Sequence, residues 1–410
     1  MIKLVSKFRI YLFVISLFST LLINAGNNDT TAFKITFKGF VKSDVIFDSR
    51  QTVSAREGFV LLYPQKPLYD SNGKDVNQGF HLNQYASSSR LIAQAIHSLN
   101  SKIKLKIYLE TDFTGSSNAT YNCMRLRHAF VRIDKDVFFL MMGHDWHPMV
   151  AEDVFPDMVS LNLGNPFKSA IRVPQLRFGL KNYHKFDFFV TASTQLDNAS
   201  NGPEGISTVY LRNAAVPNFS ANIQWTSGNY KIGGLIDSKV LKLSINDSLL
   251  GVKNNHCHSM SYSFYGKYET PNFLIKSQLI FGENLFEHVM LGGIAQKLEN
   301  SDFIVSQTAS AWLNVFWKTK KFNLGIFAGY TENMGYNNET KEKFFARGAD
   351  IHSIYRVAPQ FLYKASNKLL IFSETELTVA NYGTTDSFGR VSRHTPIPNI
   401  RENISVILLF

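Results

Sequence analysis

The sequence predicts an all-β fold, a transmembrane antiparallel β-barrel of about sixteen strands with long outer loops and short periplasmic turns. Three observations predict it. Apolar residues recur at every second position in segments of about ten residues or more, the length that a tilted strand needs to cross a bilayer. Short and long connections alternate between these segments. The last segment carries Ile404, Val406 and Leu408 on one face and ends on an aromatic residue, Phe410.

The N-terminus has the pattern of an export signal. A basic start precedes an apolar run from Ile10 to Ile23, and polar residues begin at Asn24. This run is shorter than a membrane-spanning helix requires, and its flanks are those of a secretory signal peptide. We therefore expect residues 1–25 to be a signal peptide and residues 33–410 to form one barrel domain. An uncleaved anchor helix is the alternative.

Alternation is clearest in the segment 101–114. One set of alternating side chains is apolar and consists of Ile103, Leu105, Ile107, Leu109 and Phe113. The other set is polar and consists of Lys102, Lys104, Lys106, Tyr108, Glu110 and Asp112. Because successive side chains of a strand point to opposite faces, one set would face lipid and the other the lumen. A soluble sandwich also alternates, but the dense charge of the polar face favours a barrel. We expect Lys104, Lys106, Glu110 and Asp112 to line the pore.

Comparable segments recur to the end of the chain, about sixteen in all. They lie near 33–48, 79–97, 101–114, 122–134, 136–146, 174–183, 185–196, 216–227, 229–241, 258–270, 272–284, 308–319, 321–333, 350–364, 367–382 and 399–410. An even number of strands places both chain ends on the periplasmic side, which agrees with an exported N-terminus.

Composition excludes several classes of protein. Aromatic residues make up 13% of the chain, which suits the aromatic girdles of a membrane barrel. Two cysteines, Cys123 and Cys257, are too few for a disulfide framework. The formal net charge is +11, but no basic run or nucleic-acid motif accompanies it, so we expect no nucleic-acid partner. In a pore, this excess would bias the lumen toward anions.

Five short motifs resemble the DcaP-like trimeric outer-membrane porins. They are the stretches 126–130 (LRHAF), 143–148 (GHDWHP), 174–178 (PQLRF), 39–44 (GFVKSD) and 89–91 (SRL). The resemblance covers most of the chain after the predicted signal. It implies a sixteen-stranded barrel in the bacterial outer membrane, a homotrimer in contact with outer-membrane lipid, and passage of small, often anionic, hydrophilic solutes.

The third long connection, near 147–173, is the candidate constriction. In sixteen-stranded porins the third loop folds into the barrel, where irregular backbone is tolerated because it lines water. We expect its acidic residues to face wall arginines across the pore and to set a transverse field. The acidic set is Glu152, Asp153 and Asp157, and the basic set is Arg90, Arg125, Arg127 and Arg177. Two further basic residues of this region, Lys168 and Arg172, are expected to line the pore. The alternative is that the arginines pair with carboxylates inside a plugged lumen.

The predicted function is a porin, a passive diffusion channel for small hydrophilic solutes or ions with an anion preference. A substrate-specific outer-membrane channel is one alternative. A barrel hydrolase with a closed lumen is another, but no Gly-x-Ser-x-Gly elbow or Ser/His/acid set is evident, so we expect no enzymatic activity. We expect no cofactor. Two clusters could contribute metal ligands, His144 with Asp145 and His147, and His256-Cys257-His258. We expect no metal there, because adjacent residues of an extended strand point to opposite faces, which favours histidines at the rim of the barrel. By the same alternation, His128 is expected to face outward if Arg127 faces the lumen.

Overall fold

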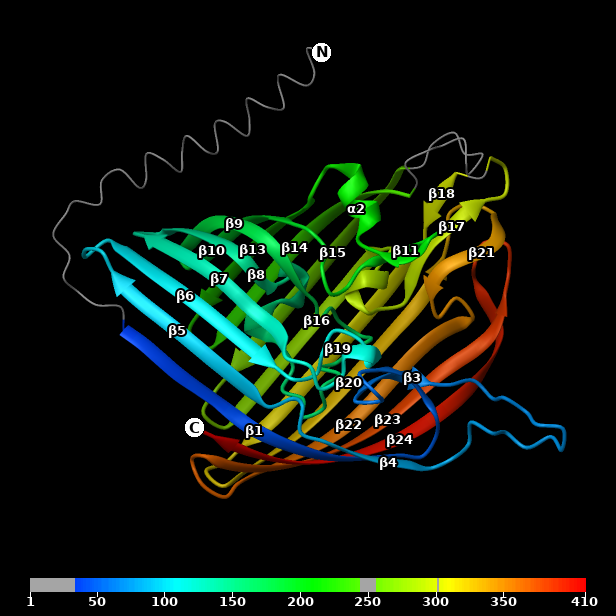
Figure 1. Ribbon diagram of the computed structural model, residues 1–410, viewed down its shortest axis with the longest axis horizontal. Coiled ribbons are helices and arrows are strands. Elements are labelled where there is room, and N and C mark those ends of the chain that lie inside the picture. The colour runs from blue at the N-terminus through cyan, green and yellow to red at the C-terminus, as the bar shows by residue number, and fades with distance from the viewer. Residues whose placement is uncertain (1–33, 244–255, 301) are drawn as a thin grey trace, which may run out of the picture.

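The chain forms a closed antiparallel barrel of sixteen wall strands (Figure 1). The computed structural model describes residues 34–243, 256–300 and 302–410. The predicted signal peptide, residues 1–25, lies outside the described residues. Closure comes from the pairing of the first strand with the last, from Phe40 opposite Leu409 to Asp48 opposite Arg401.

The predicted strands are confirmed, with small shifts at their ends. The wall consists of β1 (Lys34–Asp48), β4 (His81–Tyr85), β5 (Arg90–Ser98), β6 (Ile103–Asp112), β7 (Arg125–Lys135), β8 (Phe138–Trp146), β9 (Arg172–Tyr183), β10 (Phe186–Ser193), β13 (Asn218–Ser227), β14 (Tyr230–Lys242), β15 (His256–Glu269), β16 (Phe273–Glu283), β19 (Gln307–Lys318), β20 (Phe322–Gly335), β22 (Ile351–Lys364), β23 (Leu369–Thr385) and β24 (Val391–Leu409). Both β4 and β5 pair with β1, over different parts of it, and together make one interrupted wall strand.

The last strand is longer than predicted. It begins at Val391, although the sequence placed its start near residue 399. The sequence pattern argued against a strand over residues 391–398, because Pro396 and Pro398 cannot donate hydrogen bonds to a neighbouring strand. Their segment pairs with β23, whereas the pairing of β24 with β1 begins only at Arg401. The two prolines therefore lie where one side of the strand has no wall neighbour.

The outer face of the wall is apolar. Large exposed side chains alternate along its strands, among them Phe37, Ile107, Phe188, Ile232, Phe264, Leu279, Leu324, Val357 and Leu408. A continuous apolar band of this kind is what a barrel presents to lipid. Within the described residues, no helix is long and apolar enough to cross a membrane.

The expected orientation of His128 is wrong. The pairing of β6 with β7 shifts register between Glu110 and Thr111, so that Arg127 is an extra residue in its strand. Such a bulge lets two successive side chains point to one face. Arg127 and His128 are both buried, and His128 Nδ1 lies 2.7 Å from Asp145 Oδ1.

Smaller elements lie in the long connections. They are β2 (Thr52–Ala55), β3 (Val60–Pro64), β11 (Ser200–Gly202), β12 (Gly205–Ser207), α2 (Val209–Ala214), β17 (Gly292–Lys297), β18 (Phe303–Val305), β21 (Thr340–Arg347) and the 3-10 turns η1 (Asn118–Thr120), η2 (Pro148–Val150), η3 (Glu152–Val154) and η4 (Phe286–His288). These connections belong to the end of the barrel opposite the short turns, so they are the outer loops.

Barrel closure gives a first prediction. A Cβ added at Gly39 would lie 2.2 Å from the Arg90 carbonyl oxygen and 2.8 Å from the Phe410 ring. We expect Gly39→Val to destabilise the seam by at least about 1–3 kcal/mol, the usual cost of overpacking, and to lower the folded fraction seen as a heat-modifiable band on a gel. Gly79→Val is the matched control, since nothing lies within 4 Å of a Cβ there. Equal folded fractions for both variants would contradict this.

Candidate functional site

The third loop, residues 147–171, crosses the lumen. It connects β8 to β9, yet its backbone is hydrogen-bonded to strands of the far wall. Glu374 of β23 accepts hydrogen bonds from Val159 N and Ser160 N at 3.0 and 3.1 Å. On the same strand, Glu376 accepts two from the Asn162 amide, at 3.0 and 2.8 Å. Because all of these groups are buried, the loop is fastened across the barrel.

The acidic residues of the loop face lysines of the far wall. Asp153 lies 2.7 Å from Lys231 Nζ of β14, and Asp157 lies 2.9 Å from Lys276 Nζ of β16. The remaining acid, Glu152, lines the lumen. Two loop acids therefore have wall lysines as partners, Lys231 and Lys276, which the sequence analysis did not select.

Three of the wall arginines form ion pairs with carboxylates of β6, on the same side of the barrel. Arg127 contacts Glu110 at 2.6 Å and Asp112 at 2.7 Å. Arg125 contacts Asp112 at 2.7 Å, and Arg90 lies 3.5 Å from Glu110. Arg127 is 1% exposed and Asp112 fully buried, so this network is desolvated. The two carboxylates cannot neutralise the three arginines, and the cluster keeps a positive charge.

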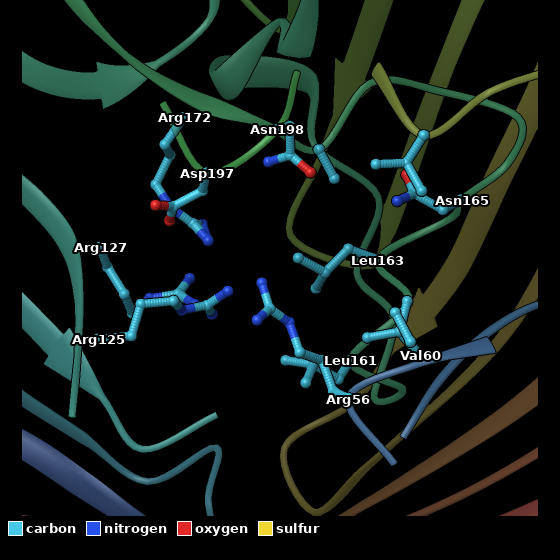
Figure 2. Close-up of a pocket in the computed structure, with 13 residues that line it drawn as sticks. Arg56, Val60, Arg125, Arg127, Leu161, Leu163, Asn165, Arg172, Asp197 and Asn198 are labelled. Atoms are coloured by element: carbon cyan, nitrogen blue, oxygen red, sulfur yellow. The ribbon is translucent and has the colours of Figure 1, made fainter. Parts of the chain in front are cut away.

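An arginine cavity of about 90 Å³ lies beside this network (Figure 2). Its guanidinium groups come from Arg56, Arg125, Arg127 and Arg172, and Asp197 is the acidic lining residue. In Figure 2 the guanidinium groups point into one space from opposite sides. Leu161 and Leu163 of the third loop also border this space.

Several guanidinium nitrogens of this cavity lack partners. Nη1 of Arg56, Nη2 of Arg127 and Nη1 of Arg172 are buried and have no hydrogen-bond partner. The Arg172 guanidinium is also held by stacking on the Trp146 ring, 4.2 Å from its centroid. Buried N–H groups without acceptors are costly, and an anionic ligand would supply the missing acceptors.

Arg56, like Asp197, Lys231 and Lys276, is a site residue that sequence reasoning missed. It lies in the first long connection, between the strands predicted near 33–48 and 79–97. The signal that could have found it is a short strand pattern, 52–55 and 60–64, around Glu57-Gly58.

A larger chamber lies under the third loop. It has a volume of about 530 Å³, and Arg177 and Lys181 on β9 line it together with Glu152 and Asp153 on the loop. A third space of about 580 Å³ contains Lys104 and Lys106 with other charged residues near the short turns.

Lys168 departs from the expectation that it lines the pore. It is fully buried inside the folded loop, where Nζ donates to the Ser169 carbonyl at 2.7 Å and lies 3.7 Å from the Phe155 ring centroid. Burial lowers the pKa of Lys168 well below its usual value. Its long apolar stem makes it a packing residue of the loop.

Glu152 has an unusual titration. The enclosing protein raises the pKa of this loop carboxyl to about 7 by desolvation, and the negative charges of Asp145 and Asp153 act in the same direction. Arg177 opposes them. Glu152 therefore changes charge near neutral pH.

One group of metal-ligating side chains comes together in the described part of the chain. His147, Asp237 and His288 place their ligand atoms within 4.8 Å of one another. Nδ1 of His147 accepts the Met149 N–H at 3.2 Å, so a neutral ring carries its proton on Nε2, 3.5 Å from Asp237. We therefore interpret the group as a polar contact between the third loop and β14. The cluster considered from the sequence is separated, because Asp145 pairs with His128.

The buried network gives a second prediction. Replacing Arg127 with leucine leaves Glu110 and Asp112 short of their main partner in a desolvated site. We expect Arg127→Leu to lower the free energy of unfolding by about 3–5 kcal/mol, measured by urea titration in lipid vesicles. Arg212→Leu, at an exposed position on α2, is the control. An unfolding midpoint equal to that of the control would mean that the network does not stabilise the barrel.

The fold is similar to those of solved outer-membrane channels. The outer membrane channel DcaP of Acinetobacter baumannii matches with a TM-score of 0.71 at 14% identity, over 94% of this chain and 99% of that chain. The anion-selective porin from Comamonas acidovorans matches with 0.57 at 9% identity, over 92% and 100%. The in-vitro folded OmpT of Vibrio cholerae in its trimer form matches with 0.54 at 14% identity, over 93% and 100%.

The sequence matches no family model and no curated protein. At the identities above, the structural likeness concerns the fold. The closed barrel and its apolar outer band are those of a bacterial outer-membrane protein. The predicted resemblance is confirmed at this level: the chain has the fold of the DcaP-like outer-membrane porins.

Proposed function

We propose that this protein is an outer-membrane porin that lets small hydrophilic solutes diffuse through its lumen, with a preference for anions. The observation that carries the proposal is the arginine cavity beside the third loop, inside a closed barrel. The cavity and its neighbouring network hold five arginines, Arg56, Arg90, Arg125, Arg127 and Arg172, and three carboxylates, Glu110, Asp112 and Asp197. The excess positive charge sits between low-dielectric walls, where its field attracts anions.

The chamber under the loop supports diffusion of polar solutes. Basic groups of β9 stand on one side, and acidic groups of the third loop on the other. Such an arrangement sets a field across the path and orients dipolar solutes as they pass. A solute that leaves the arginine cavity would therefore meet charges of both signs next.

The narrowness of the arginine cavity favours one refinement. A space of about 90 Å³ with unpartnered guanidinium N–H groups resembles an anion-binding site more than an open diffusion pore. The second candidate is accordingly a substrate-specific anion channel, in which a solute binds briefly on its way through.

We further propose that the protein is a homotrimer in outer-membrane lipid. The support is the fold shared with a Vibrio cholerae outer-membrane protein described as a trimer form. The absence of enzymatic activity remains a prediction, supported by similarity to proteins described as channels and porins.

Single-channel recording in planar bilayers under a salt gradient tests the proposal. Conductance steps with a reversal potential on the anion side would support it. Insertion without conductance would contradict it and turn attention to a closed barrel with hydrolase activity. Steps in groups of three would support the trimer.

Arg172 offers a direct test of the anion preference. We expect Arg172→Gln to lower the anion-to-cation permeability ratio by about twofold, because one of a few unneutralised charges is lost from the cavity. The fold should tolerate this change, since the partners of Arg172 in the structure are an aromatic ring and no carboxylate. Arg212→Gln removes the same charge at an exposed position of α2, which lines none of the three spaces described above, and should leave the ratio unchanged. A ratio that Arg172→Gln does not alter would remove this arginine from the ion path.

Glu152 predicts a pH dependence. Its pKa of about 7 means that the carboxyl is negative above neutral pH and neutral below it. We therefore expect anion preference to rise as the pH falls from about 8 to about 6, because a negative charge leaves the lumen. Glu152→Gln should show the low-pH selectivity throughout. A wild-type reversal potential that does not move with pH would contradict the assignment.

A further inference from the structure

The first outer loop also enters the barrel. Its hairpin, β2 and β3, buries Phe59 and Leu61 completely and Leu62 almost completely. Leu62 belongs to the same buried cluster as Val154 and Phe167 of the third loop. Two loops that are far apart in the sequence therefore pack against each other inside the wall (Figure 1).

Two buried wall arginines hold this hairpin. Arg401 of β24 donates to the Gly58 carbonyl at 2.8 Å and to the Phe59 carbonyl at 3.2 Å, while Asp48 fixes its guanidinium from the other side. Arg356 of β22 donates to the Leu62 carbonyl at 3.2 Å and also to the Asn165 carbonyl of the third loop at 2.9 Å. Both arginines are fully buried, so these contacts are shielded from water.

The tip of the hairpin has a fixed and unusual backbone. Arg56, Glu57 and Gly58 have φ angles of 58°, 55° and 90°, in the left-handed region that favours glycine and asparagine. The Glu57 carbonyl accepts from the Tyr85 hydroxyl at 2.7 Å. Two successive side-chain residues in this region indicate that surrounding contacts impose the conformation.

This conformation aims Arg56 across the arginine cavity. In Figure 2 its guanidinium faces Arg125 and Arg127 of the wall, and no hydrogen bond satisfies its buried Nη1. Arg56 is 9% exposed, and Asp197 is the acidic residue that lines the same cavity. Like charges facing each other at a desolvated site oppose folding unless an anion can lie between them.

We propose that the first-loop hairpin, residues 52–64, is a second selectivity element of this pore, and that Arg56 at its tip is a specificity-determining residue. An anion passes between Arg56 and the wall arginines, so the first loop supplies one side of the cavity. Arg401 and Arg356 are the positioning residues. This inference rests on the proposed porin function and adds the first loop to the segments that determine its selectivity.

The experiment compares three changes in single-channel recordings with potassium chloride. Arg56→Ala should lower the chloride-to-potassium permeability ratio by about twofold, with little change in folded yield, while Arg56→Lys retains most of the ratio. Replacing residues 54–61 with a short Gly-Ser link should increase the conductance, because the hairpin occupies the lumen. Replacing residues 71–74 is the matched control, since this exposed part of the same loop lies away from the cavity and should leave both quantities unchanged.

The outcomes separate the two proposals. A wild-type channel that prefers anions, combined with an unchanged ratio in Arg56→Ala, would overturn the role of Arg56 and leave the porin proposal standing. A conductance unaffected by removal of residues 54–61 would overturn the placement of the hairpin in the path. A wild-type channel without anion preference would contradict the proposed selectivity, and the conductance of the hairpin deletion would still report on the hairpin.

Discussion

Charge pairing inside the lumen holds the wall strands and the inward loops of this barrel together. The barrel buries arginines and carboxylates on its inner wall, and a buried charge is tolerated only when partners surround it. Arg401 pairs with Asp48 and donates hydrogen bonds to carbonyls of the first loop. Arg356 donates hydrogen bonds to carbonyls of both inward loops. In return, these loops obtain the backbone partners that irregular chain needs at membrane depth. Wall and loops therefore stabilise each other.

This mutual dependence divides the lumen into unlike parts. Above the third loop, an arginine excess surrounds a small cavity. Below it, Arg177 faces the acidic loop residues Glu152 and Asp153 across a much wider chamber. The same carboxylates that pin the loop, Glu374 and Glu376, are thereby withdrawn from the ion path. The distribution of charge that a solute meets thus differs from the sum of charges on the strands.

Sequence reasoning placed the wall strands because their signal is local. A period of two and a terminal aromatic need no knowledge of distant residues. The same rule failed at His128, since a bulge at Arg127 reverses the alternation and leaves no mark in the periodicity. It also could not assign partners: Asp153 and Asp157 pair with Lys231 and Lys276, and of the predicted wall arginines Arg177 shares a chamber with the loop acids.

Alternation along single segments is enough to predict the barrel, its strand number and, away from the bulge at Arg127, the side chains that each strand presents to its two faces. Packing between distant segments determines which loops enter the lumen and which charges lie close together there. Arg56 and Leu161 are about a hundred residues apart, yet line one cavity. Lys168 is polar in the sequence but fully buried in the fold. The physical reason is that desolvation and charge pairing depend on distances between segments, which periodicity does not encode.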